Sequence, residues 1–177
     1  MREAVPVLTG DPTRGGGAPA FEEYVAARGA ALWRSAWLLT GDRHKAEDLV
    51  QTALMKCWRR WSRIEDAAAV EAYVRRTMVT TYTDWWRRRW NGELPTTELP
   101  DEPDRATPDP GIRQDVLVAL ARLPRGQRAV VVLRYFDDLT EAQTATALGI
   151  SVGTVKSQTS RALRTLRESG LLEESDD

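Results

Sequence analysis

The chain has 177 residues and a formal net charge of −1, a balance that by itself argues against a nucleic-acid-binding protein. The only cysteine, Cys57, excludes an internal disulfide, and together with the only histidine, His44, it is too little for a zinc site. No apolar run approaches the roughly 20 residues of a membrane span, and the N-terminus lacks a signal pattern, so we expect a soluble, cytoplasmic protein.

The charge is segregated along the chain. Residues 21–92 have a net charge of +4, residues 93–110 of −5, and residues 111–172 of +4. Two modestly basic blocks joined by an acidic stretch predict two domains that bind DNA weakly on their own and require a larger partner.

The first block reads as three helices after a tail. Residues 1–20 contain three consecutive glycines and three prolines, and we expect them to be disordered. Apolar residues three or four positions apart then predict helices over residues 21–39, 43–61 and 70–90, with Asp42 as the N-cap of the second. Four tryptophans on these apolar faces are predicted to lie in the core: Trp33, Trp37, Trp58 and Trp61.

Residues 93–110 hold five prolines among six acidic residues, a composition that predicts a flexible linker. Helices are then expected over residues 112–123 and 126–135, within a second domain of residues 111–172, before an acidic tail at 173–177. No useful strand alternation appears. The predicted fold is all-α, with two small helical domains joined by the flexible acidic, Pro-rich linker.

The second domain contains a helix-turn-helix pattern. Thr140 and Gln143 form a capping box at the start of a short helix, Gly149 stands where a left-handed residue ends it, and Ser151 caps the next helix. An ordinary helical hairpin with a solvated outer face is the alternative, but the position of Gly149 favours DNA binding. The residues that we expect to contact DNA are polar or basic and face outward on the second helix: Ser151, Thr154, Lys156, Ser157, Gln158, Ser160 and Arg161.

Four segments also carry a family likeness: 46–51 in the first domain, and 123–130, 133–135 and 149–157 in the second. The first resembles region 2, and the others resemble region 4, of the extracytoplasmic-function (group IV) sigma factors of the sigma-70 family. The resemblance implies an alternative sigma factor, which binds core RNA polymerase and directs promoter recognition and DNA melting for transcription initiation. It further implies that residues 151–161 read the −35 promoter element.

The resemblance also implies partners and sites for the first domain. The helix with Asp48 and Gln51 is expected to dock on the clamp helices of the polymerase, with Arg59 and Arg60 further along, while region 4 meets the flap. The third helix and the preceding loop, residues 62–69, are expected to melt the −10 element and hold an unpaired base. Arg75 lies off the apolar stripe of this helix and is expected to face outward. The residues expected to act on the −10 element also lie off the stripe: Arg76, Thr80, Thr83, Asp84, Trp86, Arg87 and Arg88.

Several further expectations follow from this third helix and from the family. Trp85 and Trp86 are adjacent and cannot both face the core, so at least one is exposed. Many family members have Asn in place of Thr80 and Arg in place of Gln158, which alters the expected base contacts. Family members usually have an anti-sigma factor, and the free chain is expected to be a monomer.

Three other classes of protein are alternatives to this interpretation. A helix-turn-helix regulator acting without polymerase accounts for residues 111–167 but gives no role to the helix with Asp48. A helical enzyme is disfavoured because the sequence shows no carboxylate pair, phosphate loop, metal cluster or nucleophile–base pair, and we expect no enzyme and no cofactor. A protein-interaction adaptor is the third possibility. A DNA-binding assay with and without core polymerase would distinguish these alternatives.

Overall fold

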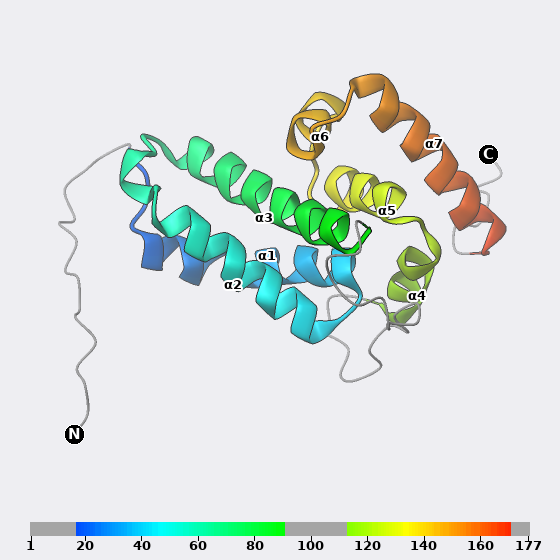
Figure 1. The fold of residues 1–177 in the computed structure, drawn as a ribbon, viewed down its shortest axis with the longest axis horizontal. Helices are drawn as coiled ribbons and strands as arrows, with labels where there is room; N and C mark the ends of the chain where they lie inside the picture. The colour runs from blue at the N-terminus through cyan, green and yellow to red at the C-terminus, as the bar shows by residue number, and fades with distance from the viewer. Residues whose placement is uncertain (1–16, 91–112, 171–177) are drawn as a thin grey trace.

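The computed structural model describes residues 17–90 and 113–170, and all of its regular elements there are helical. The first domain contains α1 (Phe21–Thr40), α2 (Arg43–Trp58), a 3-10 turn η1 (Trp61–Arg63) and α3 (Ala67–Trp90). The second contains α4 (Gln114–Arg122), α5 (Arg125–Val131), which runs into a π-helical turn η2 (Val132–Phe136), then α6 (Glu141–Leu148) and α7 (Val152–Glu168) (Figure 1). The all-α prediction is confirmed for these residues.

The turn between α1 and α2 forms as its residue types dictate. Gly41 has φ +69°, a left-handed conformation that suits glycine, and its N–H donates to Trp37 O at 2.7 Å. Asp42 then accepts from the Lys45 N–H at 2.9 Å, as predicted for the N-cap. The apolar faces of α1, α2 and α3 bury Leu39, Leu49 and Val74 in a common core.

The second helix ends at Trp58, before the predicted end at residue 61, and this corrects the placement of one tryptophan. Trp61 turns back into the core through η1, packs against Phe21 and Tyr24, and donates from Nε1 to Pro19 O at 2.9 Å. Because Trp61 fills that position, Trp58 is left 46 % exposed with Phe21 at its edge, so its prediction as a core residue is wrong. Trp37 is buried as predicted, and Trp33 is half-buried against it.

Of the predicted tails and linker, only the end of the N-terminal tail overlaps the described residues. Ala18 packs against the core and Pro19 accepts the Trp61 hydrogen bond, so residues 17–20 belong to the first domain and not to a disordered tail. The remainder of the predicted N-terminal tail, the whole predicted linker and the acidic tail lie outside the described residues.

The two domains pack against each other. Helix α1 contacts α4, α5 and η2, and α3 contacts α6, as Figure 1 shows. One apolar cluster runs through both domains, with Leu38 and Leu39 of α1 and Leu117 and Leu120 of α4 among its members. The six consecutive residues 35–40 of α1 are all buried, which requires cover on every side of the helix.

Candidate nucleic-acid and polymerase interfaces

The helix-turn-helix is built from short-range hydrogen bonds that the sequence specifies. Thr140 accepts from the Gln143 N–H at 3.1 Å and the Gln143 side chain accepts from the Thr140 N–H at 2.8 Å, which completes the capping box. Gly149 ends α6 with φ +67°, and Ser151 Oγ accepts from the Thr154 N–H at 3.1 Å to cap α7. These features confirm the predicted helix-turn-helix.

Small and branched apolar residues set the angle between α6 and α7. Ala145 is buried, which lets the helices approach closely, and Val155 packs with Val130 of α5 in the same small cluster. Ala162 and Leu166 bury the later turns of α7. The opposite face of α7 is therefore held outward on a rigid support.

Four of the residues predicted to read the −35 element lie on this outward face and are exposed: Lys156, Ser157, Ser160 and Arg161. Ser151 is exposed at the start of the helix. Thr154 and Gln158 differ from the prediction, because both are half-buried and line a cavity that faces the first domain. The open basic face is consequently narrower than the sequence suggested.

Helix α3 presents a second polar face. Arg76, Thr80, Arg87 and Arg88 are exposed, and Thr83 and Asp84 are half-buried, with Asp84 Oδ1 2.5 Å from Arg87 Nη2. The side chains of Arg89 and Trp90 are outside the described residues. The arginines therefore form a stripe along one side of the helix, with the apolar side against α2.

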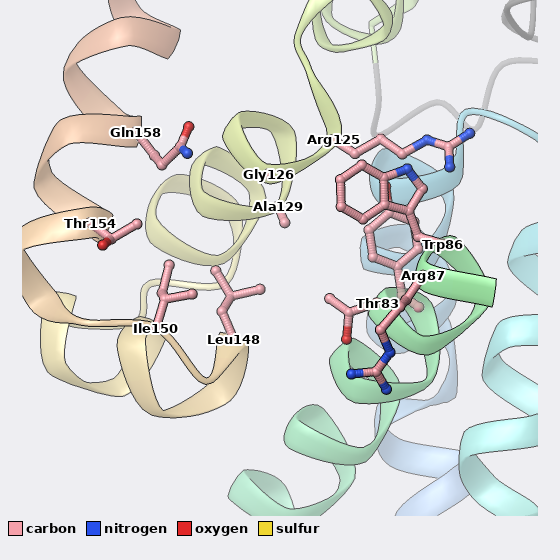
Figure 2. A pocket seen from close by; sticks show the side chains of 11 residues that line it. Thr83, Trp86, Arg87, Arg125, Gly126, Ala129, Leu148, Ile150, Thr154 and Gln158 are labelled. Carbon is pink, nitrogen blue, oxygen red and sulfur yellow. The ribbon is translucent and has the colours of Figure 1, made fainter. Parts of the chain in front are cut away.

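The adjacent tryptophans of α3 divide as predicted. Trp85 is half-buried against the core, whereas Trp86 is 37 % exposed. The Trp86 ring faces the second domain, where the guanidinium carbon of Arg125 lies 5.6 Å from its centroid (Figure 2). Trp86 is thus available as a stacking surface but is partnered by α5 in this arrangement.

Helix α2 carries a third exposed face, and two of its residues were missed by sequence reasoning. Asp48 and Gln51 are exposed as predicted, and so are Arg59 and Arg60 beyond the end of the helix. Met55, 66 % exposed, and Trp58 continue the stripe from Asp48 and Gln51 by steps of three or four residues. This spacing could have shown that Met55 and Trp58 share the face of Asp48 and Gln51, but large apolar residues such as Met and Trp are usually predicted to be buried.

The segment before α3 is shorter than predicted. The sequence suggested a loop over residues 62–69, but η1 occupies its beginning and α3 starts at Ala67. Asp66 accepts from the Ala69 N–H at 2.7 Å and so caps α3, while Glu65 is exposed. The loop proper is therefore a few residues around Ile64.

A partly buried ionic cluster lies at the other side of α3. Glu71 accepts from Tyr24 Oη at 2.8 Å, from Arg28 Nη2 at 2.9 Å and from Arg75 Nη2 at 2.6 Å. Burial raises the pKa of Glu71, but these hydrogen bonds outweigh it, so that the pKa lies below its ordinary value. Arg75 also lies 2.7 Å from Asp137 of the second domain and is only 11 % exposed, although the sequence placed it among the outward residues of α3.

Within residues 17–90 and 113–170 no group of His, Cys, Asp and Glu side chains could hold a metal ion. Cys57 is buried, and burial raises the pKa of its thiol, whereas His44 is exposed. Across the same described ranges, none of the helices is long and apolar enough to span a membrane.

Comparison with known proteins decides the family. Residues 25–92 match sigma-70 region 2, and residues 113–166 match sigma-70 region 4. The chain is 50 % identical over 152 residues to the RNA polymerase sigma-E factor of Streptomyces coelicolor, covering 84 % of each chain. The chain belongs to the sigma-70 family. It is also 38 % identical over 144 residues to the ECF RNA polymerase sigma factor SigL of Mycobacterium tuberculosis, covering 78 % of this chain and 81 % of SigL.

The sigma factor also resembles a solved relative in structure. It aligns with the sigma factor RpoE of Bartonella quintana, solved with the anti-sigma factor NepR, at a TM-score of 0.68 and 26 % identity, over 87 % of this chain and 98 % of that one. These matches span both domains and identify an extracytoplasmic-function sigma factor, which directs core RNA polymerase to promoters. They do not support a helix-turn-helix regulator that acts without polymerase.

Proposed function

We propose that this sigma factor divides promoter recognition among three exposed helix faces, with α2 binding polymerase, α3 opening the −10 element and α7 reading the −35 element. The observation that carries this proposal is that polar or basic faces stay exposed on all three helices, while the opposite faces are buried. On this proposal the protein is not an enzyme and acts in the cytoplasm as a subunit of the polymerase.

The polymerase surface is the stripe on α2, centred on Asp48 and Gln51 and extended by Met55 and Trp58. An apolar centre bordered by polar side chains is typical of a protein interface, and exposed Met and Trp are enriched at such interfaces. Arg59 and Arg60 prolong the surface beyond the helix end. Its partner is the pair of clamp helices in the largest polymerase subunit, while the flap receives the second domain.

The −10 surface is the arginine stripe of α3 together with Trp86. Arg76, Arg87 and Arg88 follow the backbone of the displaced strand, because guanidinium groups bind phosphates along it. Trp86 offers a ring on which an unpaired base can stack. Thr80 and Thr83 lie in the same stripe and contact the bases or sugars beside it.

The −35 surface is the exposed face of α7. Ser151 and the first N–H groups of the helix bind a phosphate, which fixes the register of α7 in the major groove. Lys156, Ser157, Ser160 and Arg161 then reach base edges and the flanking phosphates. Thr154 and Gln158 join them only after the second domain has moved away from α3, because both side chains face that helix here.

An anti-sigma factor is the remaining expected partner. The Bartonella quintana relative was crystallised with the anti-sigma factor NepR, and this chain shares its fold over both domains. We propose that a comparable protein binds this sigma factor and competes with polymerase for it.

A promoter-binding assay tests the proposal. A DNA mobility-shift experiment with the full chain, with and without core polymerase, should give a specific complex only when polymerase is present. Arg161→Ala should weaken that complex, whereas Arg167→Ala, an exposed arginine near the end of α7, should leave it unchanged. Specific binding by the chain alone would favour the independent regulator instead.

A further inference from the structure

A cavity lies between α3 on one side and α5, α6 and α7 on the other (Figure 2). Its volume is about 530 Å³. Sites that bind small molecules typically have volumes of roughly 300–1,000 Å³ and combine apolar walls with a few polar groups. The cavity is therefore large enough to enclose a small organic molecule, and its lining shows which chemistry that molecule would need.

One wall of the cavity is apolar. Ala129 of α5, Leu148 at the end of α6 and Ile150 in the turn after it contribute aliphatic side chains to the lining. Ala129 is buried, and Leu148 and Ile150 are half-buried. Aliphatic surface of this kind favours contact with an uncharged, apolar group, because water is released from both surfaces. This wall suits the flat face of an uncharged ring.

The opposite wall is aromatic. Trp86 of α3 is 37 % exposed, and Tyr82, one turn earlier, is buried with its hydroxyl donating to Leu39 O at 3.1 Å. Figure 2 shows the Trp86 ring across the cavity from Leu148 and Ile150. Exposed aromatic side chains stack on nucleic-acid bases of any sequence, because every base has a π-face. A planar ring in the cavity would therefore contact Trp86 on one face and aliphatic groups on the other.

The charged side chains in the lining are both cationic. They are Arg87 of α3 and Arg125 of α5, and no described lining residue is acidic. The Arg125 guanidinium carbon lies 5.6 Å from the centroid of the Trp86 ring, and this guanidinium makes no hydrogen bond or ion pair with another described residue. Arg87 uses one nitrogen, Nη2, for its ion pair with Asp84. Guanidinium groups bind phosphate oxygens through paired N–H donors, so the lining favours an anionic group beside the ring.

Tyr82 gives a second indication of positive potential at the cavity. Burial raises the pKa of its hydroxyl, whereas the charges of Arg128 and Arg125 act to lower it. Arg128 donates to three backbone carbonyl oxygens and is held by them. Arg125 has no such contact, so Arg125 is the cation of this pair that can bind a ligand.

Polar side chains complete the lining. Thr83 of α3 and Thr154 and Gln158 of α7 all contribute to it. The hydroxyls of Thr83 and Thr154 already bond within their own segments, to Thr80 O and to Ser151 Oγ. The Gln158 carboxamide makes no hydrogen bond with another described residue and offers both donors and an acceptor. Such a group matches the edge of a nucleic-acid base, which carries donors and acceptors side by side.

We propose that this cavity binds a free nucleotide. The base stacks on Trp86 and packs against Leu148 and Ile150, with its edge at Gln158. The phosphate pairs with Arg125. A bound nucleotide occupies Trp86 and Gln158, both of which are proposed above to contact DNA, so the nucleotide and the promoter compete for the same side chains.

Isothermal titration calorimetry of the full free chain with AMP and with GMP tests the proposal. At least one of them should bind one-to-one and at least about tenfold more tightly than inorganic phosphate or its parent nucleoside, because each of these supplies only part of the contacts. Trp86→Ala should weaken binding by about 5- to 150-fold, the usual value of a base–aromatic stack, whereas Trp86→Phe retains a ring and most of the affinity.

The phosphate contact has a matched control. Arg125→Gln should remove the advantage of the nucleotide over its nucleoside, because the nucleoside has no phosphate. Arg164→Gln removes the same charge from an exposed position of α7 outside the lining and should bind like the wild type. Equal losses in both variants would indicate general attraction of anions and would overturn the proposed site.

Gly126→Leu distinguishes the cavity from the exposed face of Trp86. Gly126 is part of the lining, and a Cβ there would have Gln158 Nε2 as its nearest neighbour at 3.9 Å, an ordinary van der Waals contact. A leucine side chain should therefore fill part of the cavity without disturbing the backbone and should abolish nucleotide binding. Thermal unfolding checks the fold, and if this variant unfolds, Trp86→Ala and Arg125→Gln decide the outcome.

Two results would refute the nucleotide site. They are the absence of one-to-one binding of both AMP and GMP to the wild type, and wild-type affinity in a folded Gly126→Leu or in Trp86→Ala. The measurement contains neither polymerase nor promoter DNA, so its failure leaves the proposed function standing. Failure of the promoter-binding assay likewise leaves this site standing.

Discussion

The polymerase surface on α2 can be tested without disturbing the fold. Asp48→Arg combined with Gln51→Ala alters two exposed side chains, and the free energy of unfolding should change by no more than about 0.5 kcal/mol. Placing a like or unpaired charge in an interface costs about 2–5 kcal/mol of binding free energy. The affinity for core polymerase should therefore fall by roughly 30-fold to several thousand-fold.

Competition binding measures this loss. Labelled wild-type sigma factor is displaced from core polymerase by increasing amounts of each unlabelled variant, and thermal unfolding of the same samples confirms the fold. Glu22→Arg is the control, because it reverses an exposed charge of α1 that does not belong to the α2 stripe, and it should compete like the wild type.

Met55→Ala provides an independent arm of the same experiment. Its side chain is 66 % exposed and contributes little to the core, so stability should be unchanged. If the α2 stripe is the interface, this truncation should still weaken polymerase binding measurably. Wild-type competition by both the double variant and Met55→Ala would refute the assignment of α2 as the docking surface.

Four other predictions concern DNA and stability. Arg161→Ala should cost about 1–3 kcal/mol of promoter-binding free energy in holoenzyme mobility shifts, and full affinity would mean that the wrong face of α7 was chosen. Arg87→Ala with Arg88→Ala should still bind polymerase but open duplex promoters poorly in abortive transcription, and a template with a bubble at −10 should restore activity; equal losses on both templates would indicate general affinity instead. Cys57 should be alkylated only as fast as the protein unfolds, because its thiol is buried with a raised pKa, and rapid labelling of native protein would contradict this. Because the pKa of Glu71 is lowered in the folded chain, ionised Glu71 should stabilise the fold above about pH 4.3, the ordinary pKa of a glutamate, and this stabilisation should be lost as the pH falls through the lowered value. Glu71→Gln should therefore lower the melting temperature at pH 7 and make the melting temperature less dependent on pH in acid.

Local features were predictable because they depend on neighbours in sequence. The capping box of Thr140 and Gln143, the left-handed Gly149 and the N-caps Asp42 and Ser151 all rest on hydrogen bonds or dihedral angles within three or four residues. Apolar residues spaced three or four positions apart likewise predicted the buried faces of α2, α3 and α7. The family was inferred from the resemblance of short motifs, because apolar spacing alone does not indicate a family.

Two errors in the placement of aromatic and charged residues have a common cause. Trp58 was predicted to lie in the core because it continues the apolar spacing, but the chain turns after it and Trp61 fills that space. Arg75 was predicted to face outward because it lies off the apolar stripe of α3, but Asp137 covers it. Each outcome depends on a residue outside the helix that carries the pattern, since Trp61 belongs to η1 and Asp137 to the second domain.

The sequence by itself determined the helices, their caps, the helix-turn-helix and the polar faces, because hydrogen bonding and amphipathic spacing act over one or two turns. Only the tertiary structure decided that residues 35–40 of α1 are buried all round, that Gln158 faces α3, and that Asp137 pairs with Arg75. Those features join residues up to 102 positions apart, as between Ser35 and Asp137. A periodic pattern shows which face of a helix is apolar or polar, but the residue that will cover that face is fixed only when the domains pack together.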